Sequence, residues 1–234
     1  MKLRGRTVES VRRHGKFLLI DLDDGHKLVA HLGMSGRFSV TDRDEPTAAH
    51  THFVAEMENG KQIRFIDPRT FGFVAVYDED EISASGVGRL GPDAWEDPPT
   101  VEALALTLSG RKAPIKALLL DQRPISGLGN IYADEVLFAA QIHPLTPGGE
   151  LSNVKLRALL EATREVLSGA IESGGTTLDD LAYLLPDGRA GDNLDRLAVY
   201  GREGEPCLVC GAEVMRTVVR ARSTHFCPSC QEGP

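Results

Sequence analysis

The sequence predicts an α+β protein of more than one domain, in which strands come first, helices next and a small metal-binding module last. Three observations lead to this order. Short runs rich in β-branched and aromatic residues fill the first third of the 234-residue chain. Longer apolar runs at helical spacing follow, and all four cysteines lie near the C-terminus. A chain of this length can bury one large core or two modest ones.

The first third is predicted to form an antiparallel sheet or sandwich. Its runs alternate partly between apolar and polar residues, and "DDG" at 23–25 and "ENG" at 58–60 are signals of tight turns between strands. The strands are expected at residues 16–22, 26–32, 36–40, 51–57, 61–66 and 71–77.

Residues 78–99 are acidic and rich in proline and glycine, which predicts a connecting segment and a domain boundary. Helices are expected beyond it, at 101–110 with Thr100 as N-cap, at 129–143, at 151–175 and, as a short segment, at 177–185. We place the domains at 1–90, 91–197 and 198–232.

The charge pattern leaves the class of partner open. A net charge of −8 argues by itself against nucleic acid, but residues 1–20 are mostly basic and residues 78–102 are mostly acidic, so a basic face remains compatible with the sequence. The chain has no run of eighteen apolar residues and no secretory signal. We therefore expect a cytoplasmic protein without a membrane partner.

Two C-x2-C pairs separated by sixteen residues match the spacing of a four-cysteine zinc ribbon: Cys207 with Cys210, and Cys227 with Cys230. Four thiolates leave no open coordination position, so the expected cofactor is one structural Zn²⁺ rather than a catalytic one. Two disulfides or redox-active thiols are the alternative.

The segment between the cysteine pairs alternates like a hairpin, and Arg216, Arg220 and Arg222 are predicted to share one face of it. Arginines on a rigid hairpin suit phosphate recognition. Three solvated surface arginines are an equal alternative.

A glycine-led helix start is a second candidate anion site. Gly127, Gly129 and Asn130 stand where a helix is expected to begin, and free backbone N–H groups at such a start bind anions. Lys112 and Lys116 lie just upstream and strengthen the prediction, whereas a simple turn is the alternative.

Eight motifs in order resemble the formamidopyrimidine-DNA glycosylase family, nearest to its bacterial 8-oxoguanine branch. They are "RRHGKFLL", "HLGMSG", "DPRTFG", "GLGNIYADE", "HP", "GGTTL", "VYGREGEPC" and the terminal cysteine module. The resemblance implies a β-sandwich, truncated here at its start, then a helix–two-turn–helix domain and a zinc finger, with DNA in the cleft between the halves. It also implies a monomeric base-excision-repair DNA glycosylase and AP lyase, which removes oxidised purines from duplex DNA and nicks the strand by β,δ-elimination.

The resemblance further implies that Met34, Arg69 and Phe71 fill the gap left by a flipped nucleotide, with Arg69 on the orphaned base, which is expected to be cytosine. An apolar wedge suits such an unstacked gap. A place for Met34 and Phe71 in the core is the alternative.

By the same resemblance, a further set of residues contacts DNA, most of them at the phosphates around the lesion, and Arg222 also serves δ-elimination. The expected DNA contacts are Lys16, His31, His50, Arg69, Arg111, Asn130, Tyr200, Arg216 and Arg222. Individually, Lys16 could instead be a solvated charge and His31 a core histidine. Residues 185–196 fall where the family has its lesion-capping loop and depart from its usual sequence there.

The family nucleophile is a proline directly after the initiator methionine, followed by a glutamate, whereas this sequence begins "MKLRGRTVE". Three interpretations compete: a fragment or a gene model begun at an internal methionine, which we favour; a non-catalytic binder of damaged DNA or AP sites; and weak substitution by the amine of Met1 or by Lys2. A zinc-ribbon scaffold for protein partners is an alternative from another functional class.

Overall fold

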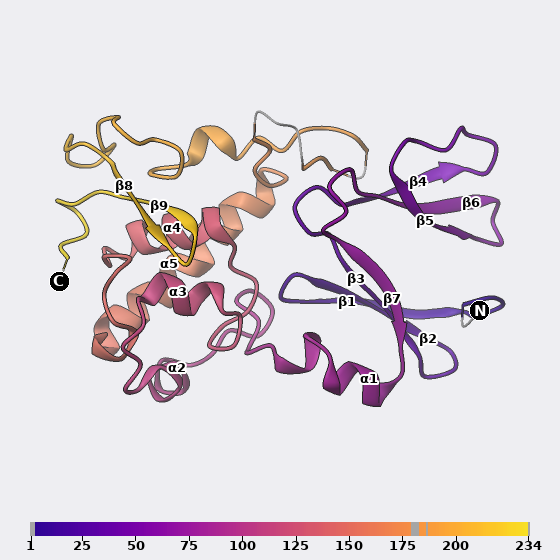
Figure 1. Cartoon of the computed structure of the whole chain (residues 1–234), viewed down its shortest axis with the longest axis horizontal. Helices are drawn as coiled ribbons and strands as arrows, with labels where there is room; N and C mark the ends of the chain where they lie inside the picture. The colour runs from indigo at the N-terminus through magenta and orange to yellow at the C-terminus, as the bar shows by residue number, and fades with distance from the viewer. Residues whose placement is uncertain (1–2, 179–182, 186, 234) are drawn as a thin grey trace. The chain divides into compact units, whose positions relative to one another are not determined.

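The computed structural model describes residues 3–178, 183–185 and 187–233. The chain divides into two compact units, one made of Met1–Gly88 and Glu172–Leu194, the other of Arg89–Ile171 and Asp195–Pro234. The predicted order of strands, helices and a cysteine-rich hairpin is confirmed (Figure 1). Met1, Lys2 and the middle of the short helix predicted at 177–185, residues 179–182, lie outside the described residues, and the described residues 177–178 and 183–185 are not helical. Over the described ranges, no helix is both long and apolar enough to cross a membrane.

The first unit contains two antiparallel sheets, as predicted (Figure 1). One sheet has the strand order β1-β2-β3-β7 and the other β4-β6-β5. The strands are β1 (Val8–His14), β2 (Phe17–Leu22), β3 (Lys27–His31), β4 (Arg37–Asp42), β5 (Thr51–Glu56), β6 (Lys61–Ile66) and β7 (Phe73–Tyr77). Leu19, Val29 and Phe65 are among the buried residues of this unit.

Strand β1 was not predicted from the sequence. It is an edge strand, exposed along most of its length, so it does not show the alternation of a half-buried strand. Its polar residues serve the pairing instead: Arg12 Nη2 lies 2.8 Å from Asp21 Oδ2 on β2, and Ser10 Oγ donates to the same carboxylate. Cross-strand polar contacts thus replace apolar burial here.

The composition of residues 78–99 predicted a plain connecting segment. The acidic run at 78–81 instead forms the N-cap and first turn of helix α1 (Glu79–Ala84). Asp78 Oδ1 accepts from the Glu81 N–H at 2.8 Å, and Glu81 Oε2 accepts from the Asp78 N–H at 2.9 Å. This capping box satisfies two backbone donors, and acidic side chains are favourable at the positive end of a helix. A short 3-10 turn, η1 (Val87–Arg89), follows.

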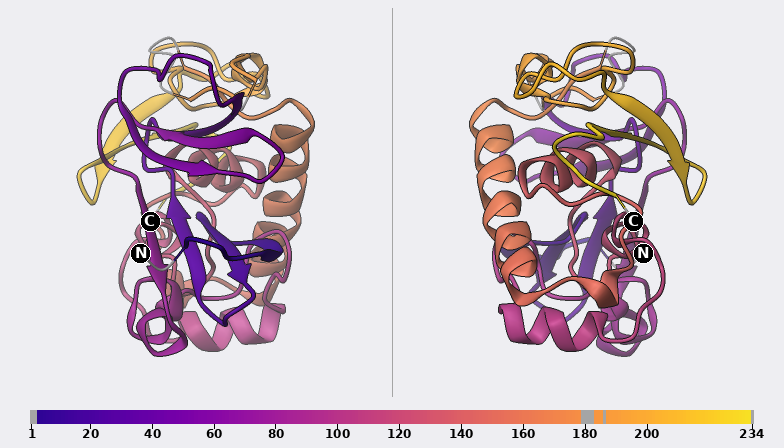
Figure 2. Two further views of the ribbon diagram at one scale, coloured as in Figure 1. Left: turned by 90° about the vertical axis from the view of Figure 1, so that its right-hand side faces the viewer. Right: turned by 90° about the vertical axis from the view of Figure 1, so that its left-hand side faces the viewer.

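The second unit is helical. Its helices are α2 (Val101–Leu108), α3 (Ile115–Leu120), α4 (Asn130–Ala139) and α5 (Asn153–Glu172), with 3-10 turns η2 (Gly148–Glu150) and, at the unit boundary, η3 (Leu194–Arg196). Thr100 Oγ1 accepts from the Ala103 N–H at 3.2 Å, which confirms the predicted N-cap of α2. Leu104, Leu128 and Leu159 pack in one buried cluster. Figure 2 shows α5 as the longest helix, with α2 lying crosswise below it.

Helix α3 was missed because six residues are too short to show helical periodicity. The hairpin of strands β8 (Met215–Val219) and β9 (Arg222–Phe226) follows the helices in the same unit and was predicted.

Glycines allow two loops of the first unit to approach closely. A Cβ added to Gly36 would lie 2.3 Å from Leu32 O and 2.9 Å from the Phe65 ring. A Cβ added to Gly72 would lie 2.6 Å from His31 O. The loop at 67–72 can therefore meet the loop at 31–36 only if position 72 lacks a side chain, and the loop at 31–36 can turn back on itself against Phe65 only if position 36 lacks one.

We predict that Gly36→Ala lowers the free energy of unfolding by about 2–3 kcal/mol, because the new methyl group overlaps backbone and a buried ring that cannot move away. Urea denaturation measures the loss. The matched control is Gly86→Ala, where the nearest atom to an added Cβ is 3.8 Å away. That control should stay within about 0.5 kcal/mol of the parent, and equal losses in the two variants would refute the close approach.

Candidate nucleic-acid interface and metal centre

Asp67 joins the two loops of the first unit. Its side chain is fully buried. Oδ1 accepts from Ser35 Oγ at 2.6 Å and from the Arg69 N–H at 3.3 Å, and Oδ2 accepts from the Gly72 N–H at 2.7 Å. One donor comes from the loop at 31–36 and two from the loop at 67–72, so a single carboxylate connects both.

Burial by itself raises the pKa of Asp67, but the hydrogen bonds from Ser35, Gly72, Arg69 and Phe71 outweigh it and hold this pKa below its ordinary value. The carboxylate therefore stabilises the fold at neutral pH. An unfolded aspartate titrates near about 3.9. The stabilising contribution is present above that pH and is lost as the pH falls through the lower folded-state pKa.

Met34 and Phe71 project from these two loops into solvent, since 49% of Met34 and 60% of Phe71 is exposed. The Arg69 guanidinium carbon lies 5.3 Å from the centre of the Phe71 ring. The alternative that both apolar residues belong to the core is therefore wrong. The contact between the loops brings the three predicted gap-filling residues onto one pair of adjoining loops.

His31 and Lys16 are also brought together. The His31 ring lies at the end of β3, 4.9 Å from the centre of the Phe17 ring and 6.2 Å from that of Phe73. Burial, and secondly the charge of Lys16, lower the pKa of His31. Its Nδ1 accepts from the Gly33 N–H at 3.0 Å, so the neutral ring carries its proton on Nε2. His50 is exposed, and its carbonyl accepts from the Asp67 N–H at 3.0 Å.

In the second unit, the hairpin places its arginines differently from the prediction. Residues paired across a hairpin lie on the same face. Arg222 pairs with Val219, whereas Arg216 pairs with His225. Because residues 222 and 225 are an odd number of positions apart on one strand, Arg216 and Arg222 lie on opposite faces, and the prediction of a shared face is wrong. Because the turn has two residues, Val219 and Arg222 face the same side of the hairpin, and even-numbered residues of β8 face the side opposite to even-numbered residues of β9.

Arg220 occupies the turn, with φ of 48° followed by 57° at Ala221. Its Nη1 lies 3.4 Å from Asp121 Oδ2, at the end of α3. Arg123 contacts the same carboxylate, and the two arginines, Arg123 first, hold the pKa of Asp121 below its ordinary value. Arg220 thus shares one carboxylate with Arg123, which offsets its charge in part.

The sequence suggested that Lys116 supports an anion site at the glycine-led helix, but its side chain is fully buried. Its Nζ lies 2.6 Å from Asp134 Oδ1 and donates to Ser223 O at 2.7 Å and Thr224 Oγ1 at 2.9 Å. Asp134 Oδ2 in turn accepts from the His225 N–H at 2.9 Å. Burial lowers the pKa of Lys116, against the opposing effect of Asp134. This ion pair ties α3 and α4 to β9, directly beside Arg222.

Glu135, the next residue of α4, fixes the segment that carries Tyr200. Its buried carboxylate accepts from the N–H groups of Ala198 at 2.7 Å, Val199 at 3.0 Å and Tyr200 at 2.8 Å. Burial raises the pKa of Glu135, although these three donors act to lower it. The Tyr200 ring meets the His225 ring edge-on at 4.9 Å between centres.

Asn130 begins helix α4, as predicted, after the N-cap Gly129, and its Nδ2 lies 3.4 Å from Ser223 Oγ. Gly129 contributes no side-chain cap, so the first N–H groups of α4 lack that partner. Asn130 and Tyr200 therefore both contact β9, at Ser223 and His225, next to Arg222 along the chain. Arg111 lies in the loop after α2, where its carbonyl accepts from the Gly149 N–H at 2.9 Å.

Sequence reasoning missed Asp67, Asp134 and Glu135, and it assigned Lys116 to an anion site instead of to a buried ion pair. An available signal was the pair of adjacent acids in "ADEVLFAA", since charged residues within an otherwise apolar helix are buried only when they have partners.

The stretch at 185–196, predicted to be the lesion-capping loop, spans residue 186, which is outside the described residues. Nearby, Thr177 Oγ1 accepts from the Gly191 N–H at 2.8 Å, and Thr176 Oγ1 from Asn193 Nδ2 at 2.9 Å.

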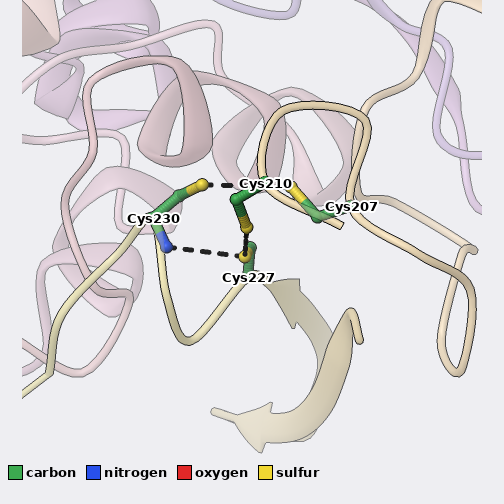
Figure 3. A group of neighbouring side chains, drawn as sticks. All are labelled: Cys207, Cys210, Cys227 and Cys230. Carbon is green, nitrogen blue, oxygen red and sulfur yellow. Dashed lines mark hydrogen bonds between the residues drawn. The ribbon is translucent and has the colours of Figure 1, made fainter. Parts of the chain in front are cut away.

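The four cysteines converge at the base of the hairpin (Figure 3). Their sulfur atoms all lie within 4.8 Å of one another, with Cys207 Sγ 3.9 Å from Cys230 Sγ and Cys210 Sγ 3.4 Å from Cys227 Sγ. Zinc–sulfur bonds of about 2.3 Å in a tetrahedron place sulfurs about 3.8 Å apart. The cysteines are free thiols, so a disulfide arrangement is not what the structure contains. The donor set and its spacing fit a tetrahedral metal.

Three family models match the chain. The formamidopyrimidine-DNA glycosylase N-terminal domain matches residues 1–74, and the formamidopyrimidine-DNA glycosylase H2TH domain matches residues 90–181. The zinc finger found in FPG and IleRS matches residues 204–233.

Curated relatives and solved structures share this assignment. Formamidopyrimidine-DNA glycosylases from Roseiflexus sp. (strain RS-1) and Thermus thermophilus are 45% and 47% identical to the chain, over 98% of it and 83% and 85% of their own length. The crystal structure of MutM (Fpg) from Thermus thermophilus superposes with a TM-score of 0.87 at 46% identity, covering 98% of this chain and 85% of that one. Lactococcus lactis Fpg in complex with abasic-site DNA gives 0.87 at 33% identity, covering 99% and 84%.

We predict that Lys116→Met costs about 3–5 kcal/mol of unfolding free energy, because it leaves the Asp134 carboxylate buried without a counter-charge. Lys112→Met, at an exposed position four residues earlier, is the control and should change stability by less than about 0.5 kcal/mol. Urea unfolding compares the variants. Adding Asp134→Leu to Lys116→Met should restore most of the loss, and a double variant no more stable than the single one would contradict the pairing.

Proposed function

The chain belongs to the formamidopyrimidine-DNA glycosylase family, and from this premise we propose that it is a base-excision-repair glycosylase acting on duplex DNA that contains damaged bases or abasic sites. The observation that carries the proposal is the identity of 47% to a curated glycosylase over 98% of the chain. The proposed substrates are oxidised purines, 8-oxoguanine and formamidopyrimidines. Base release is followed by strand cleavage through β,δ-elimination, performed by a monomer.

In the proposed mechanism, the damaged nucleotide leaves the base stack and Met34 with Phe71 fills the gap. The exposure of both side chains supports this role, because a wedge must be free to enter the duplex. Arg69, beside Phe71, hydrogen-bonds the unpaired partner base, with cytosine as the preferred one. Unstacking costs a few kcal/mol, which contacts with the gap offset in part.

Backbone phosphates around the lesion are bound by side chains of both units, which fix the register of the protein on DNA without reading sequence. The proposed set is Lys16, His31, Asn130, Tyr200, Arg216 and Arg222, and His50 and Arg111 are proposed to make further contacts with DNA. Arg222 is the proposed proton donor in δ-elimination. Support comes from the anchoring of the adjacent Ser223 by Lys116, which limits the movement of Arg222.

One structural Zn²⁺ is the proposed cofactor, held by Cys207, Cys210, Cys227 and Cys230. When bound, it supplies rigidity and no chemistry, because four thiolates fill its coordination sphere. Cys207 and Cys227 are buried in a small apolar cluster with Val214, so the finger core is built around the ligands.

The function is tested on duplexes carrying one 8-oxoguanine, one formamidopyrimidine or one abasic site opposite cytosine. Base release and nicking are measured with borohydride present and absent. A covalent adduct, mapped by peptide mass spectrometry to the attacking amine, supports a glycosylase and lyase. Preferential binding of these duplexes without base release or adduct would identify a damaged-DNA binder instead. If the chain shows no salt-dependent DNA binding, the result supports a scaffold for protein partners instead.

Arg222→Ala is predicted to flatten the slope of log affinity against log salt by about 0.9, because one phosphate contact is lost. Arg220→Ala, two positions away on the same hairpin, is the control and should change the slope less, since its charge faces Asp121. Fluorescence anisotropy across a salt series measures both slopes, and a larger change for Arg220→Ala would reverse the assignment.

Cys210→Ser is predicted to abolish stoichiometric zinc and to weaken DNA binding, because metal binding supplies the folding free energy of so small a finger. Elemental analysis should find about one zinc per parent chain. Ser229→Ala, within the second cysteine pair but without a ligand atom, is the control and should keep its zinc. Retention of zinc by Cys210→Ser would exclude the four-thiolate site.

A further inference from the structure

We propose that Asp67 and Ser35 are positioning residues, whose buried carboxylate–hydroxyl contact holds Met34, Arg69 and Phe71 in the arrangement that enters DNA. The inference rests on the proposed function of those three exposed residues. It adds the device that orients them, which lies beneath the loops and touches no DNA in this assignment.

Asp67 is fixed through its backbone as well as its side chain. Its N–H donates to His50 O at 3.0 Å, and its carbonyl accepts from His52 Nε2 at 2.9 Å and from the Thr70 N–H at 3.3 Å. The Asp67 carboxylate is therefore held in one position at the end of β6, which serves as a reference point. The groups that hydrogen-bond to this carboxylate are held in place as well.

Each gap-filling residue lies next to a group bonded to this reference point. Met34 is flanked by Ser35, which donates to Asp67, and by Gly33, where an added Cβ would lie 2.6 Å from the Gly72 N atom. Met34 is therefore held on both sides by the other loop. The Arg69 N–H contacts both Ser35 Oγ, at 3.2 Å, and Asp67 Oδ1, at 3.3 Å.

Phe71 is held in a similar way. It lies between Thr70, which has a φ of 56°, and Gly72, whose N–H donates to Asp67 at 2.7 Å. A threonine in the left-handed region costs of order 1–3 kcal/mol and persists only where its surroundings impose it. The bonds that Asp67 makes on both sides of Thr70 supply that constraint.

A carboxylate is required because every group facing it is a donor. The Ser35 hydroxyl and the N–H groups of Arg69 and Gly72 all point at the two oxygens. An asparagine has the same shape but replaces one oxygen with a donor, so it leaves at least one of these groups facing another donor. Asp67→Asn thus tests the bonding with little change in volume.

The first test uses the free protein. With ¹³C-methyl methionine, Met34 should show a changed shift and greater mobility in Asp67→Asn and in Ser35→Ala, whereas Met57 and Met215 stay unchanged and serve as internal controls. Asp42→Asn, at an exposed position on β4, is the matched control. An unaltered Met34 signal in both variants would overturn the proposal whether or not the chain acts on DNA.

The second test uses the ratio of affinities for abasic-site and undamaged duplex. Asp67→Asn should lower this ratio about 10- to 100-fold, as expected for misplaced groups, while leaving the salt dependence of binding to undamaged DNA unchanged. In a Met34→Ala, Phe71→Ala background it should add little. An equal fall in both backgrounds, or a loss of stability with the ratio intact, would show a purely structural role.

The two proposals fail in different ways. A parent chain that does not prefer abasic-site DNA contradicts the proposed function, and the Met34 signal still decides the positioning role. If Asp67→Asn does not fold by circular dichroism, Ser35→Ala decides, because it removes one donor and leaves the carboxylate bonded to the N–H groups of Arg69 and Gly72.

Discussion

The 2.6 Å ion pair between Lys116 and Asp134 is the interaction on which the arrangement of the second unit depends. Two opposite charges without solvent are tolerated only when every remaining donor and acceptor finds a partner. Here those partners are supplied by β9, through Ser223, Thr224 and the His225 N–H. The pair therefore demands that the hairpin lie against α3 and α4 in one position, which apolar packing alone would specify less tightly.

In the first unit a buried charge is also compensated by hydrogen bonds, but it has no counter-charge among the described residues. Asp67 is buried with hydrogen-bond donors from two loops, and this acid defines how the loops meet. Met34 and Phe71 in the first unit and Arg222 in the second are exposed, while the groups that hold their backbone in place are buried and polar. The ends of these exposed side chains can thus move while their backbone is held in place.

The sequence allowed the strands at 17–77, the helices with clear periodicity and the cysteine cluster to be predicted, because alternation, helical spacing and ligand spacing are local properties. Strand β1 escaped, since an exposed edge strand carries polar residues on both faces. Helix α3 escaped because it is too short to show a period.

Within the candidate site, the family motifs indicated the exposed residues but not the groups beneath them. Lys116 appeared in the sequence as one more basic residue near a helix start. Only the tertiary contacts with Asp134 and Ser223 reveal it as a buried anchor. The opposite faces of Arg216 and Arg222 follow from strand register, which depends on turn length rather than on the alternation within either strand. The net charge of −8 was equally uninformative, because it averages over separate surfaces.

The two-residue turn at Arg220 and Ala221 has a consequence for how such a finger can vary among relatives. Both residues adopt left-handed φ values that asparagine and glycine accept more readily, so substitution there is permitted and even favourable. A change in length is different. One inserted or deleted residue shifts the pairing of β9 by one position and turns Arg222 to the other side, together with every residue after it. Residues that accept left-handed φ should therefore be able to replace one another in this turn, whereas its length should stay constant.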